Sequence, residues 1–325
     1  MKRILIVLLA VLSAFASSAC RTGNVEPPPT ENLETMRPTA TEEPTATEEP
    51  TDEVDFGLLE VYVFGIGKAD AILLITKNHT VMIDAGERKH GQFILDELEK
   101  RGIYGIDCLI VTHFHKDHVG GAAAVIENVA VKEVVVPNYG KDSAHYGRFA
   151  AAMSEAGLLA SVLTKTQSFR FDGVEFTLYP AWQGFYHYGG GEDDDEYEDE
   201  GEDGGMAPEE NNFSIAVGVT HGENSFLFAG DAKAKRLKEL LSDTKAMTWD
   251  YLKIPNHGRH NRRSAEFIYA ASPRYAVITT SPDNPADGRV VSALEGIGAE
   301  IYMADKSGVY CISDGKSLDV GYTPW

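Results

Sequence analysis

The 325-residue sequence has little positive charge: 29 lysines and arginines stand against 50 aspartates and glutamates, for a net charge of −21. Most of the excess lies in two segments, because residues 21–55 contribute −8 and residues 192–203 contribute −10. Proteins that capture nucleic acid through its phosphates need a surplus of lysine and arginine. The charge balance therefore argues against broad electrostatic binding of nucleic acid and disfavours duplex DNA as a partner.

The sequence also lacks an apolar run of the about 20 residues that a membrane-spanning helix needs. The short apolar run from Ile4 to Leu12 follows Lys2 and Arg3 and leads into small residues up to Cys20. This order is typical of a secretory signal. Residues 17–20, Ser-Ser-Ala-Cys, are similar to a lipobox in which serine replaces the preferred leucine. We therefore expect residues 1–20 to be a signal peptide and Cys20 to carry a lipid; ordinary cleavage after residue 19 is the alternative.

Residues 21–55 have almost no aliphatic side chains and are rich in proline, threonine and glutamate, with Thr-Glu-Glu-Pro at 41–44 and again at 47–50. Such a segment cannot bury enough apolar surface to offset the entropy of ordering, so we expect a disordered linker. A linker makes most sense when its start is anchored. This favours an exported lipoprotein held on the outer side of the membrane through Cys20, with residues 56–325 forming one large α/β domain.

Only three cysteines are present, and two of them, Cys108 and Cys311, lie in strand-like apolar runs. Buried free thiols behave as small hydrophobic side chains, and this is the expectation for both. A disulfide between Cys108 and Cys311 is the alternative in an exported protein.

A glycine-bounded acidic block occupies residues 189–205, with ten acidic side chains between 192 and 203. Like charges at this density repel one another, so the block is expected to be a flexible loop. Calcium binding is the alternative, because hard cations prefer carboxylate oxygens, although the spacing matches no EF-hand.

Strand-like and helix-like segments follow one another in two blocks. Expected strands lie at 57–63, 71–76, 80–84, 107–112, 131–136, 174–179, 213–220, 225–229, 250–254, 275–280, 299–303 and 309–313. Expected helices lie at 92–100, 120–127, 143–156, 234–241, 265–271 and 290–296. Two blocks of strands, with helices after many of them, predict two sheets face to face, flanked by helices.

The segment with the clearest chemistry is His113-Phe114-His115-Lys116-Asp117-His118, between an apolar strand and two glycines. Imidazole and carboxylate groups are the ligands of hydrolytic zinc sites, and several must converge on one point. A turn at the end of a strand can present alternate residues to one metal and their neighbours to a second. The segment therefore predicts a metal site; a polar loop with incidental histidines is the alternative.

This His-x-His-x-Asp-His segment resembles that of the metallo-β-lactamase fold. Over residues 57–320, the chain resembles the branch found as the extracellular domain of the competence protein ComEC and in related exported phosphodiesterase-like proteins. Further segments carry the resemblance in order: 65–71, with alanine at 69 where glycine is usual, 81–86, 211–215, 226–231 and 252–258. The resemblance implies an α/β fold of the αββα four-layer sandwich type and a metal-dependent hydrolase.

The resemblance also implies how the ligands would be shared. One metal would take His113 and His115, and the other would take Asp117, His118 and His257, with Asp231 bridging. Zinc, as one or two ions per chain, is the expected metal, with manganese as the alternative. Asp84 and Asp70 would support the ligand loops rather than bind metal.

Two departures from the family pattern concern these ligands. Asn256 replaces the first histidine of the usual pair, so the ligand there must be His257 or nothing. No histidine stands where the wider fold supplies a third ligand to the first metal. Asn212 occupies part of that region, and His187 and His221 are the other candidates.

Two metals can bind a bridging hydroxide and clamp the attacking and leaving oxygens of an in-line displacement. Asp117 would orient this nucleophile, and Lys253, together with Arg259, would balance the charge of a phosphate. We therefore expect a cell-surface phosphodiesterase with small phosphodiester substrates. The alternatives are a hydrolase of esters, lactones or β-lactams, a nuclease, and a non-catalytic binding protein with a vestigial site.

Overall fold

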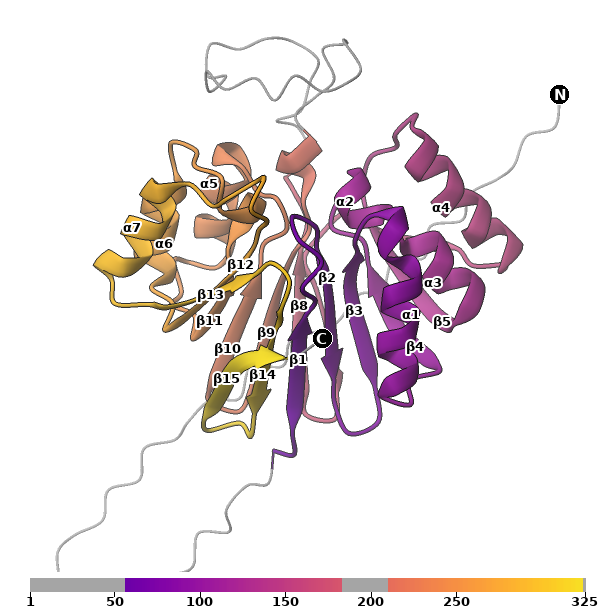
Figure 1. Ribbon diagram of the computed structural model, residues 1–325, viewed down its shortest axis with the longest axis horizontal. Coiled ribbons are helices and arrows are strands. Elements are labelled where there is room, and N and C mark those ends of the chain that lie inside the picture. The colour runs from indigo at the N-terminus through magenta and orange to yellow at the C-terminus, as the bar shows by residue number, and fades with distance from the viewer. Residues whose placement is uncertain (1–55, 183–209, 324–325) are drawn as a thin grey trace, which may run out of the picture. The chain divides into compact units, whose positions relative to one another are not determined.

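The computed structural model describes residues 56–182 and 210–323, which form two mixed β-sheets with helices on their outer faces (Figure 1). The predicted signal peptide with Cys20, the linker and the acidic block at 189–205 lie outside these residues. Within the described segments, no helix combines the length and the apolar character that crossing a membrane requires.

The first sheet contains β1 (Leu59–Val63), β2 (Ala71–Ile75), β3 (Thr80–Ala85), β4 (Gly105–Ile110), β5 (Ala130–Pro137), β6 (Ala160–Leu163), β14 (Gly308–Ser313) and β15 (Leu318–Thr323). The second contains β7 (Gln167–Phe171), β8 (Val174–Tyr179), β9 (Ala216–His221), β10 (Asn224–Phe228), β11 (Tyr251–Lys253), β12 (Tyr275–Thr279) and β13 (Glu300–Ala304). Their orders are β15-β14-β1-β2-β3-β4-β5-β6 and β13-β12-β11-β10-β9-β8-β7. The second sheet thus contains β7 to β13 in chain order, with β7 and β8 before residues 183–209 and the other strands after them, and β14 and β15 return to the first sheet.

Helices cover the outer face of each sheet. Those on the first sheet are α1 (Gly91–Lys100), α2 (Lys116–Val119), α3 (Ala122–Asn128) and α4 (Ala144–Glu155). Those on the second are α5 (Ala234–Asp243), α6 (Ser264–Ala271) and α7 (Gly288–Gly296). A third apolar cluster, with side chains from both sheets, fills the space between them. Three cores between four layers confirm the expected αββα sandwich.

The two buried cysteines lie in one row of side chains across the first sheet. Cys311 pairs with Val61, Val61 with Leu74, Leu74 with Val81, and Val81 with Cys108. Four strand spacings of about 4.8 Å separate the cysteines by about 19 Å, whereas a disulfide needs Cα atoms closer than about 7 Å. Both thiols are free and buried, as expected, and burial raises the pKa of Cys108 to about 12.

The predicted helices and most of the predicted strands form close to their expected bounds. Strands β6, β7 and β15 were not predicted, and each of them forms an edge of its sheet. An edge strand pairs on one side only and exposes more polar residues, so its sequence carries a weaker apolar pattern.

Candidate metal centre

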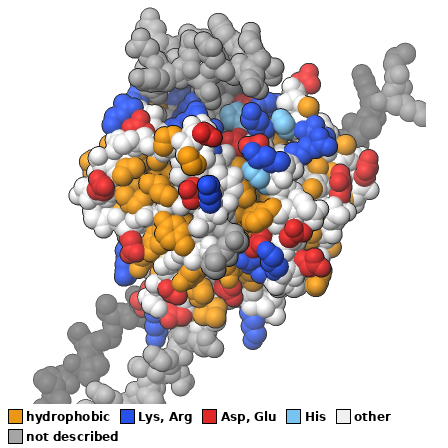
Figure 2. Space-filling view, in the orientation of Figure 1, with side chains coloured by type: hydrophobic (Ala, Val, Ile, Leu, Met, Phe, Trp, Pro, Cys, Tyr) orange, Lys and Arg blue, Asp and Glu red, His pale blue; other side chains and the backbone are white. Residues whose placement is uncertain are grey.

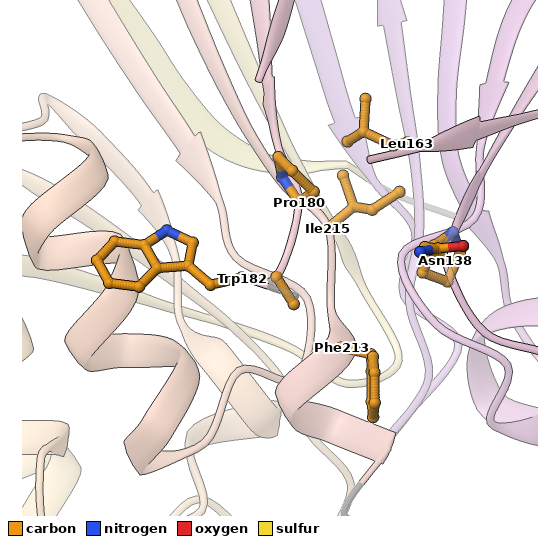
Figure 3. A pocket seen from close by; sticks show the side chains of 8 residues that line it. Asn138, Leu163, Pro180, Trp182, Phe213 and Ile215 are labelled. Carbon is orange, nitrogen blue, oxygen red and sulfur yellow. The ribbon is translucent and has the colours of Figure 1, made fainter. Parts of the chain in front are cut away.

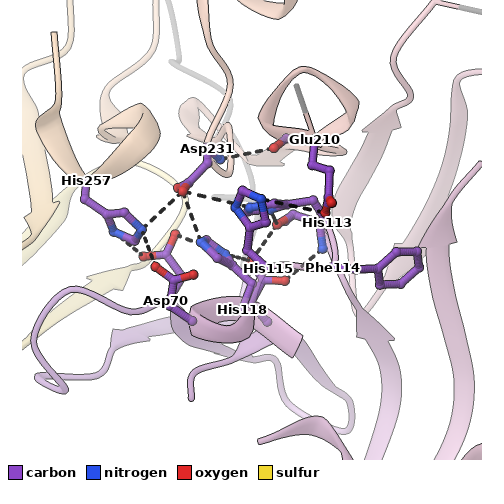
Figure 4. A network of polar contacts seen from close by, with 12 residues as sticks. Asp70, His113, Phe114, His115, His118, Glu210, Asp231 and His257 are labelled. Carbon is purple, nitrogen blue, oxygen red and sulfur yellow. Dashed lines mark hydrogen bonds and ion pairs between the residues drawn. The ribbon is translucent and has the colours of Figure 1, made fainter. Parts of the chain in front are cut away.

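The histidine-rich loop begins three residues after β4 ends. His113 is fully buried, and its ring stands against that of His115, with 4.7 Å between the ring centroids. Phe114 points the opposite way, where it packs against the rings of Tyr139 and Phe149 (Figure 4). The backbone N–H of Phe114 donates to Tyr139 Oη at 2.8 Å. This aromatic anchor holds the loop so that the two histidines share one side.

The glycines that follow α2 allow this loop to lie against the end of β3. A Cβ atom on Gly121 would lie 2.1 Å from the carbonyl oxygen of Ala85, which no other residue type could tolerate. Asp117 and His118, on α2, are thereby held beside the strand end and are both buried.

The second sheet supplies the other predicted ligands. Asp231 follows β10, and His257 lies in the short helix η3 (Pro255–Gly258) that follows β11. Asp231 Oδ2 lies 3.3 Å from His118 Nε2, 3.3 Å from His257 Nε2 and 3.9 Å from His113 Nε2 (Figure 4). Asp117 Oδ2 lies 3.5 Å from His257 Nε2. The structure thus brings these five side chains together, with the Asp231 carboxylate in the central position expected of a bridging ligand.

Several buried atoms of this cluster have no hydrogen-bond partner within the described segments. They are the Nε2 atoms of His113, His118 and His257 and the Oδ1 atom of Asp231. Leaving a buried polar atom unpaired costs about 1–3 kcal/mol, so four in one place require an explanation. Two donor atoms that bind one ion at about 2.0–2.1 Å can be at most about 4.2 Å apart, and the distances around Asp231 meet this limit. The donor set fits a divalent cation.

Hydrogen bonds behind the cluster fix the protonation of two of these imidazoles. Asp84 accepts from Thr112 N–H at 2.8 Å and from Thr112 Oγ1 at 2.7 Å, and its Oδ2 lies 2.7 Å from His118 Nδ1. The Thr112 hydroxyl oxygen then accepts from His113 Nδ1 at 3.1 Å. This network assigns the ring protons to Nδ1 and leaves both Nε2 lone pairs directed at Asp231.

His257 is oriented in the same manner from the other sheet. Its Nδ1 lies 2.9 Å from Thr279 Oγ1, and that hydroxyl donates to Asp70 Oδ1 at 2.7 Å. The Thr279 oxygen therefore accepts from Nδ1–H, and the Nε2 lone pair of His257 faces Asp231 as well. Asp84 contacts Nδ1 of His118 directly, and Asp70 contacts the Thr279 hydroxyl that binds Nδ1 of His257. Both aspartates therefore lie where residues that support the ligands are expected.

The structure does not bring Lys253 to the accessible side of the cluster, where sequence analysis expected it to contact a phosphate. Its side chain is fully buried, and its ammonium group forms an ion pair with Asp70 Oδ2. Burial raises the pKa of Asp70, but Lys253 and His257 outweigh this and lower it. Lys253 therefore keeps Asp70 ionised behind His257. Because the lysine side chain is fully buried, a substrate cannot contact its ammonium group in the folded protein.

Electrostatic interactions within the cluster are strong because water is excluded. Burial alone lowers the pKa of His118, but the carboxylates of Asp231 and Asp84 raise it well above its usual value. Burial raises the pKa of Asp231, and His257 and His118 bring it well below its usual value. Burial also lowers the pKa of His113 far below that of a free histidine. Without a cation, protonated histidines such as His118 thus balance the negative charge of the carboxylates in the cluster.

His115, the sixth predicted ligand, stands apart from this group. Among the described residues, it belongs to no set of three donor atoms within 4.8 Å of one another. Its Nε2 atom lies instead 3.7 Å from Glu210 Oε2. Sequence analysis did not single out Glu210, and the one signal that could have indicated it is its place just before the Asn-Asn-Phe-Ser segment.

The other residues considered for a third ligand point elsewhere. The side-chain oxygen of Asn212 accepts from the backbone N–H of Arg236 at 3.2 Å, near the start of α5. His221 bonds to Ser313 Oγ at 2.8 Å and to the backbone oxygen of Phe56 at 3.1 Å, away from the cluster. His187 lies outside the described residues.

The backbone around His257 is unusual. Asn256 and His257 have φ values of 49° and 53°, in the left-handed region, and Gly258 follows at 74°. Residues without glycine's freedom adopt this region at a cost, and such positions concentrate at functional sites. The turn aims His257 at Asp231, and the backbone N–H of Asn256 donates to the carbonyl of Gly230, the residue before Asp231, at 3.1 Å.

Two lysines stand at the accessible side. Lys68 Nζ lies 3.4 Å from Asp117 Oδ2, and Lys141 Nζ lies 2.8 Å from Glu210 Oε1. Each lysine side chain is 24% exposed. Figure 2 shows histidine side chains at the surface with lysine and arginine side chains around them. Positive charge that could meet an anion is therefore present at the cluster without Lys253.

A separate hollow of about 280 Å³, open solvent included, lies beside β8 and β9 (Figure 3). It is lined by Pro137, Asn138, Leu163, Pro180, Ala181, Trp182, Phe213 and Ile215. None of these lining residues carries a group that titrates near neutral pH, so their side chains offer no general acid or base and no imidazole or carboxylate ligand.

The family model described as metallo-beta-lactamase superfamily matches residues 64–281, a range that contains the whole cluster. The chain belongs to this superfamily. It is 22% identical over 277 residues to ComE operon protein 3 of Bacillus subtilis, covering 77% of this chain and 32% of that protein. It is 23% identical over 234 residues to recombination protein 2 of Haemophilus influenzae, covering 70% and 25%. The superfamily and the competence-protein branch expected from the motifs are confirmed, and the chain spans at most about a third of these relatives.

Among solved structures, the metallo-β-lactamase-fold protein YhfI from Bacillus subtilis resembles this chain with a TM-score of 0.51. The two are 10% identical, and the similarity covers 81% of this chain and 100% of YhfI. At this identity the similarity shows the fold alone, and it agrees with the four-layer arrangement.

Proposed function

We propose that this protein is a divalent-metal-dependent hydrolase of small phosphodiesters. One observation carries the metal-dependent part: three buried imidazole Nε2 atoms around Asp231, and Oδ1 of Asp231 itself, have no hydrogen-bond partner among the described residues. The hydrogen bonds behind the histidines direct the Nε2 lone pairs toward Asp231. A buried arrangement of this kind is stable only with something that accepts those lone pairs. A divalent cation is the ligand that matches imidazole and carboxylate donors together.

We assign His113 and His115 to one metal position and Asp117, His118 and His257 to a second, with Asp231 shared between them. Zinc is the proposed ion, because imidazole dominates the donor set, and manganese is the alternative. A bound divalent cation would supply Lewis-acid activation of water and of the scissile group.

The protein's own residues would bind and orient the reactants. Asp117, next to the accessible side, can accept a hydrogen bond from the attacking water and set its direction. Lys68 and Lys141 stand close enough to the cluster to balance a phosphate's charge. An uncharged carbonyl substrate has no need of two cations there, which favours a phosphodiester. The acidic balance of the whole chain favours a small substrate over a long polyanion.

We further propose that the protein is exported and anchored to the membrane by a lipid on Cys20, with residues 21–55 as the linker to the catalytic domain. The sequence pattern of residues 1–20 and the composition of the linker support this. In cells, the unaltered chain should fractionate with membranes and the Cys20→Ala variant should not. Equal membrane association of both would contradict the anchor.

The substrate proposal can be tested with purified protein stripped by EDTA and reloaded with Zn²⁺ or Mn²⁺. We expect the reloaded protein to hydrolyse bis-(p-nitrophenyl) phosphate and the EDTA-treated protein to be inactive. The Lys68→Met variant should lose phosphodiesterase activity at unchanged metal content, and Lys89→Met, which removes an exposed lysine elsewhere, should not. Turnover of lactams, lactones or simple esters with no turnover of any phosphodiester would contradict the substrate class and leave the metal site intact.

A further inference from the structure

The histidine that stands apart from the metal cluster has a carboxylate partner of its own. His115 Nε2 lies 3.7 Å from Glu210 Oε2, which is within the span of two donor atoms that bind one ion. The ring of His115 also lies against that of His113 (Figure 4). The Nε2 atom of His113 has no hydrogen-bond partner in the part of the chain that the structure describes and lies 3.9 Å from Asp231 Oδ2. The donor side chains therefore lie next to one another in the order Glu210, His115, His113 and Asp231.

Glu210 is held in place from both sides. It begins the short helix η2 (Glu210–Phe213), and directly after this helix the backbone N–H of Ile215 donates to the Thr112 carbonyl at 3.0 Å, which joins the segment to the histidine loop. Lys141 Nζ binds Oε1 of Glu210 at 2.8 Å, while Oε2 faces His115. Lys141 thus balances the charge of Glu210 at Oε1, and Oε2 faces the imidazole of His115.

Tyr139 couples Glu210 to the same loop. Its hydroxyl accepts from the backbone N–H of Phe114 at 2.8 Å and donates to Glu210 Oε2 at 3.4 Å. Its ring packs on Phe213, three residues after Glu210, with 4.7 Å between centroids. A surface ion pair between Lys141 and Glu210 would need none of these contacts, and the Glu210 side chain is only 12% exposed.

We propose that Glu210 is the third ligand of the first metal position, completing His113 and His115 with a carboxylate where histidine is absent. Because no three donor atoms that include His115 lie within 4.8 Å of one another among the described residues, the side chains of His115 and Glu210 would turn toward His113 as the ion binds. This inference rests on the metal-dependent function proposed above and deepens it. The first position then has two imidazoles and the carboxylates of Glu210 and Asp231, with Tyr139 and Lys141 orienting the Glu210 side chain.

The proposal has a consequence for metal preference. Imidazole favours zinc, whereas each carboxylate makes a site more suitable for harder ions such as Mn²⁺. A first position with two carboxylates should therefore accept Mn²⁺ more readily than a position with three histidines. Replacing Glu210 by histidine should shift this position toward zinc.

The test is metal titration of the purified, EDTA-treated full chain, followed by calorimetry and by elemental analysis of the loaded protein. We expect the unaltered chain to bind two ions. Glu210→Gln should bind one ion as before and the other at least about tenfold more weakly. Glu223→Gln, which neutralises an exposed glutamate in the turn after β9, is the matched control and should behave as the unaltered chain.

Two further variants keep the proposal testable if Glu210→Gln folds poorly. Tyr139→Phe keeps the ring stack and removes the hydroxyl, and it should weaken the same ion. Glu210→His should restore the zinc affinity but not the Mn²⁺ affinity of that position. Two ions bound within twofold of the unaltered affinities in both Glu210→Gln and Tyr139→Phe would overturn the proposal, and so would a single ion in the unaltered chain. Two ions that depend on Glu210, in a protein that hydrolyses no substrate, would support it and contradict only the proposed hydrolase function.

Discussion

Lys253 and Asp70 form a fully buried ion pair that joins the two sheets, because Lys253 ends β11 and Asp70 precedes β2, 183 residues earlier in the chain. Asp70 then holds Thr279, whose hydroxyl accepts from His257. A lysine that would stabilise a substrate must reach it. Lys253 instead acts through Asp70 on the orientation of His257.

Replacing Lys253 by methionine should therefore affect stability and metal binding before it affects substrate binding. Removing Lys253 leaves the Asp70 carboxylate buried without its cationic partner and with only the Thr279 hydroxyl and nearby imidazoles around it. The loss of one partner of a buried ion pair costs about 3–5 kcal/mol in the free energy of unfolding. Urea unfolding and metal content of Lys253→Met measure both effects. Lys89→Met, which removes an exposed lysine 3.4 Å from Glu87, is the control and should change neither. A stable Lys253→Met protein with full metal content and a raised KM alone would contradict this role.

The buried histidines allow a matched test of the metal cluster. His118→Gln should lose at least one metal ion per chain, because Nε2 of His118 lies 3.3 Å from the central Asp231 oxygen. His221 is equally buried but bonds to Ser313, outside the cluster. His221→Gln should keep the full metal content per folded chain, measured by elemental analysis after gel filtration. Equal metal content in the two variants would contradict the assignment of His118.

The stability of the metal-free protein should depend on pH through His118 and His257. Against the effect of burial, Asp231 with Asp84 or Asp70 raises their pKa values above the usual 6.5. At these two histidines the metal-free folded state therefore binds more protons than the unfolded chain above pH 6.5, so their contribution to the free energy of unfolding should fall as pH rises beyond that value. Urea unfolding of EDTA-treated protein between pH 6.5 and 8 measures this.

The same protons must leave when metal binds. Calorimetry of Zn²⁺ binding near pH 7, in buffers of different ionisation enthalpy, should show proton release, and the release should diminish in His118→Gln. Proton uptake, or stability that rises across this pH range, would contradict the raised pKa values.

The two internal thiols should be inert while the protein is folded. Burial raises the pKa of Cys108 to about 12 and also raises that of Cys311. Because the thiolate is the reactive species, a Cys20→Ser chain should react with a disulfide reagent at pH 8 only after unfolding, and then at two sites. Rapid modification of one site in the folded protein is the result that would contradict this.

The sequence predicts most of this site because its chemistry is local. His113, His115, Asp117 and His118 lie within six residues after a strand, and a strand followed by a turn has few ways to present them. The fold was likewise predictable, since strands in the interior of the sheets have either continuous apolar patterns, as in β10, or alternating ones, as in β1 and β8. The edge strands β6, β7 and β15 were missed because half or more of the residues in each strand are exposed or only partly buried.

The roles of Lys253 and Glu210 could not be predicted in the same way, because both depend on distant segments. In the sequence, Lys253 is a charged residue at the end of a strand. It forms a buried ion pair only because Asp70 approaches it from the first sheet. Glu210 follows a run rich in acidic residues, so its side chain has no distinguishing pattern. Its contact with His115 arises only when the two sheets pack together.

The exchange of strands between the sheets means that the two described segments are interlocked. A protease that cuts between residues 183 and 209 would leave β8, which also pairs with β7, hydrogen-bonded to β9 from the other fragment, and β14 bonded to β1. Each fragment also holds part of the metal cluster, with His113 and His118 on one and Asp231 and His257 on the other. The nicked protein should therefore run as one species on gel filtration and separate only in denaturant. Metal, by bridging the fragments, should raise the denaturant concentration at which they part.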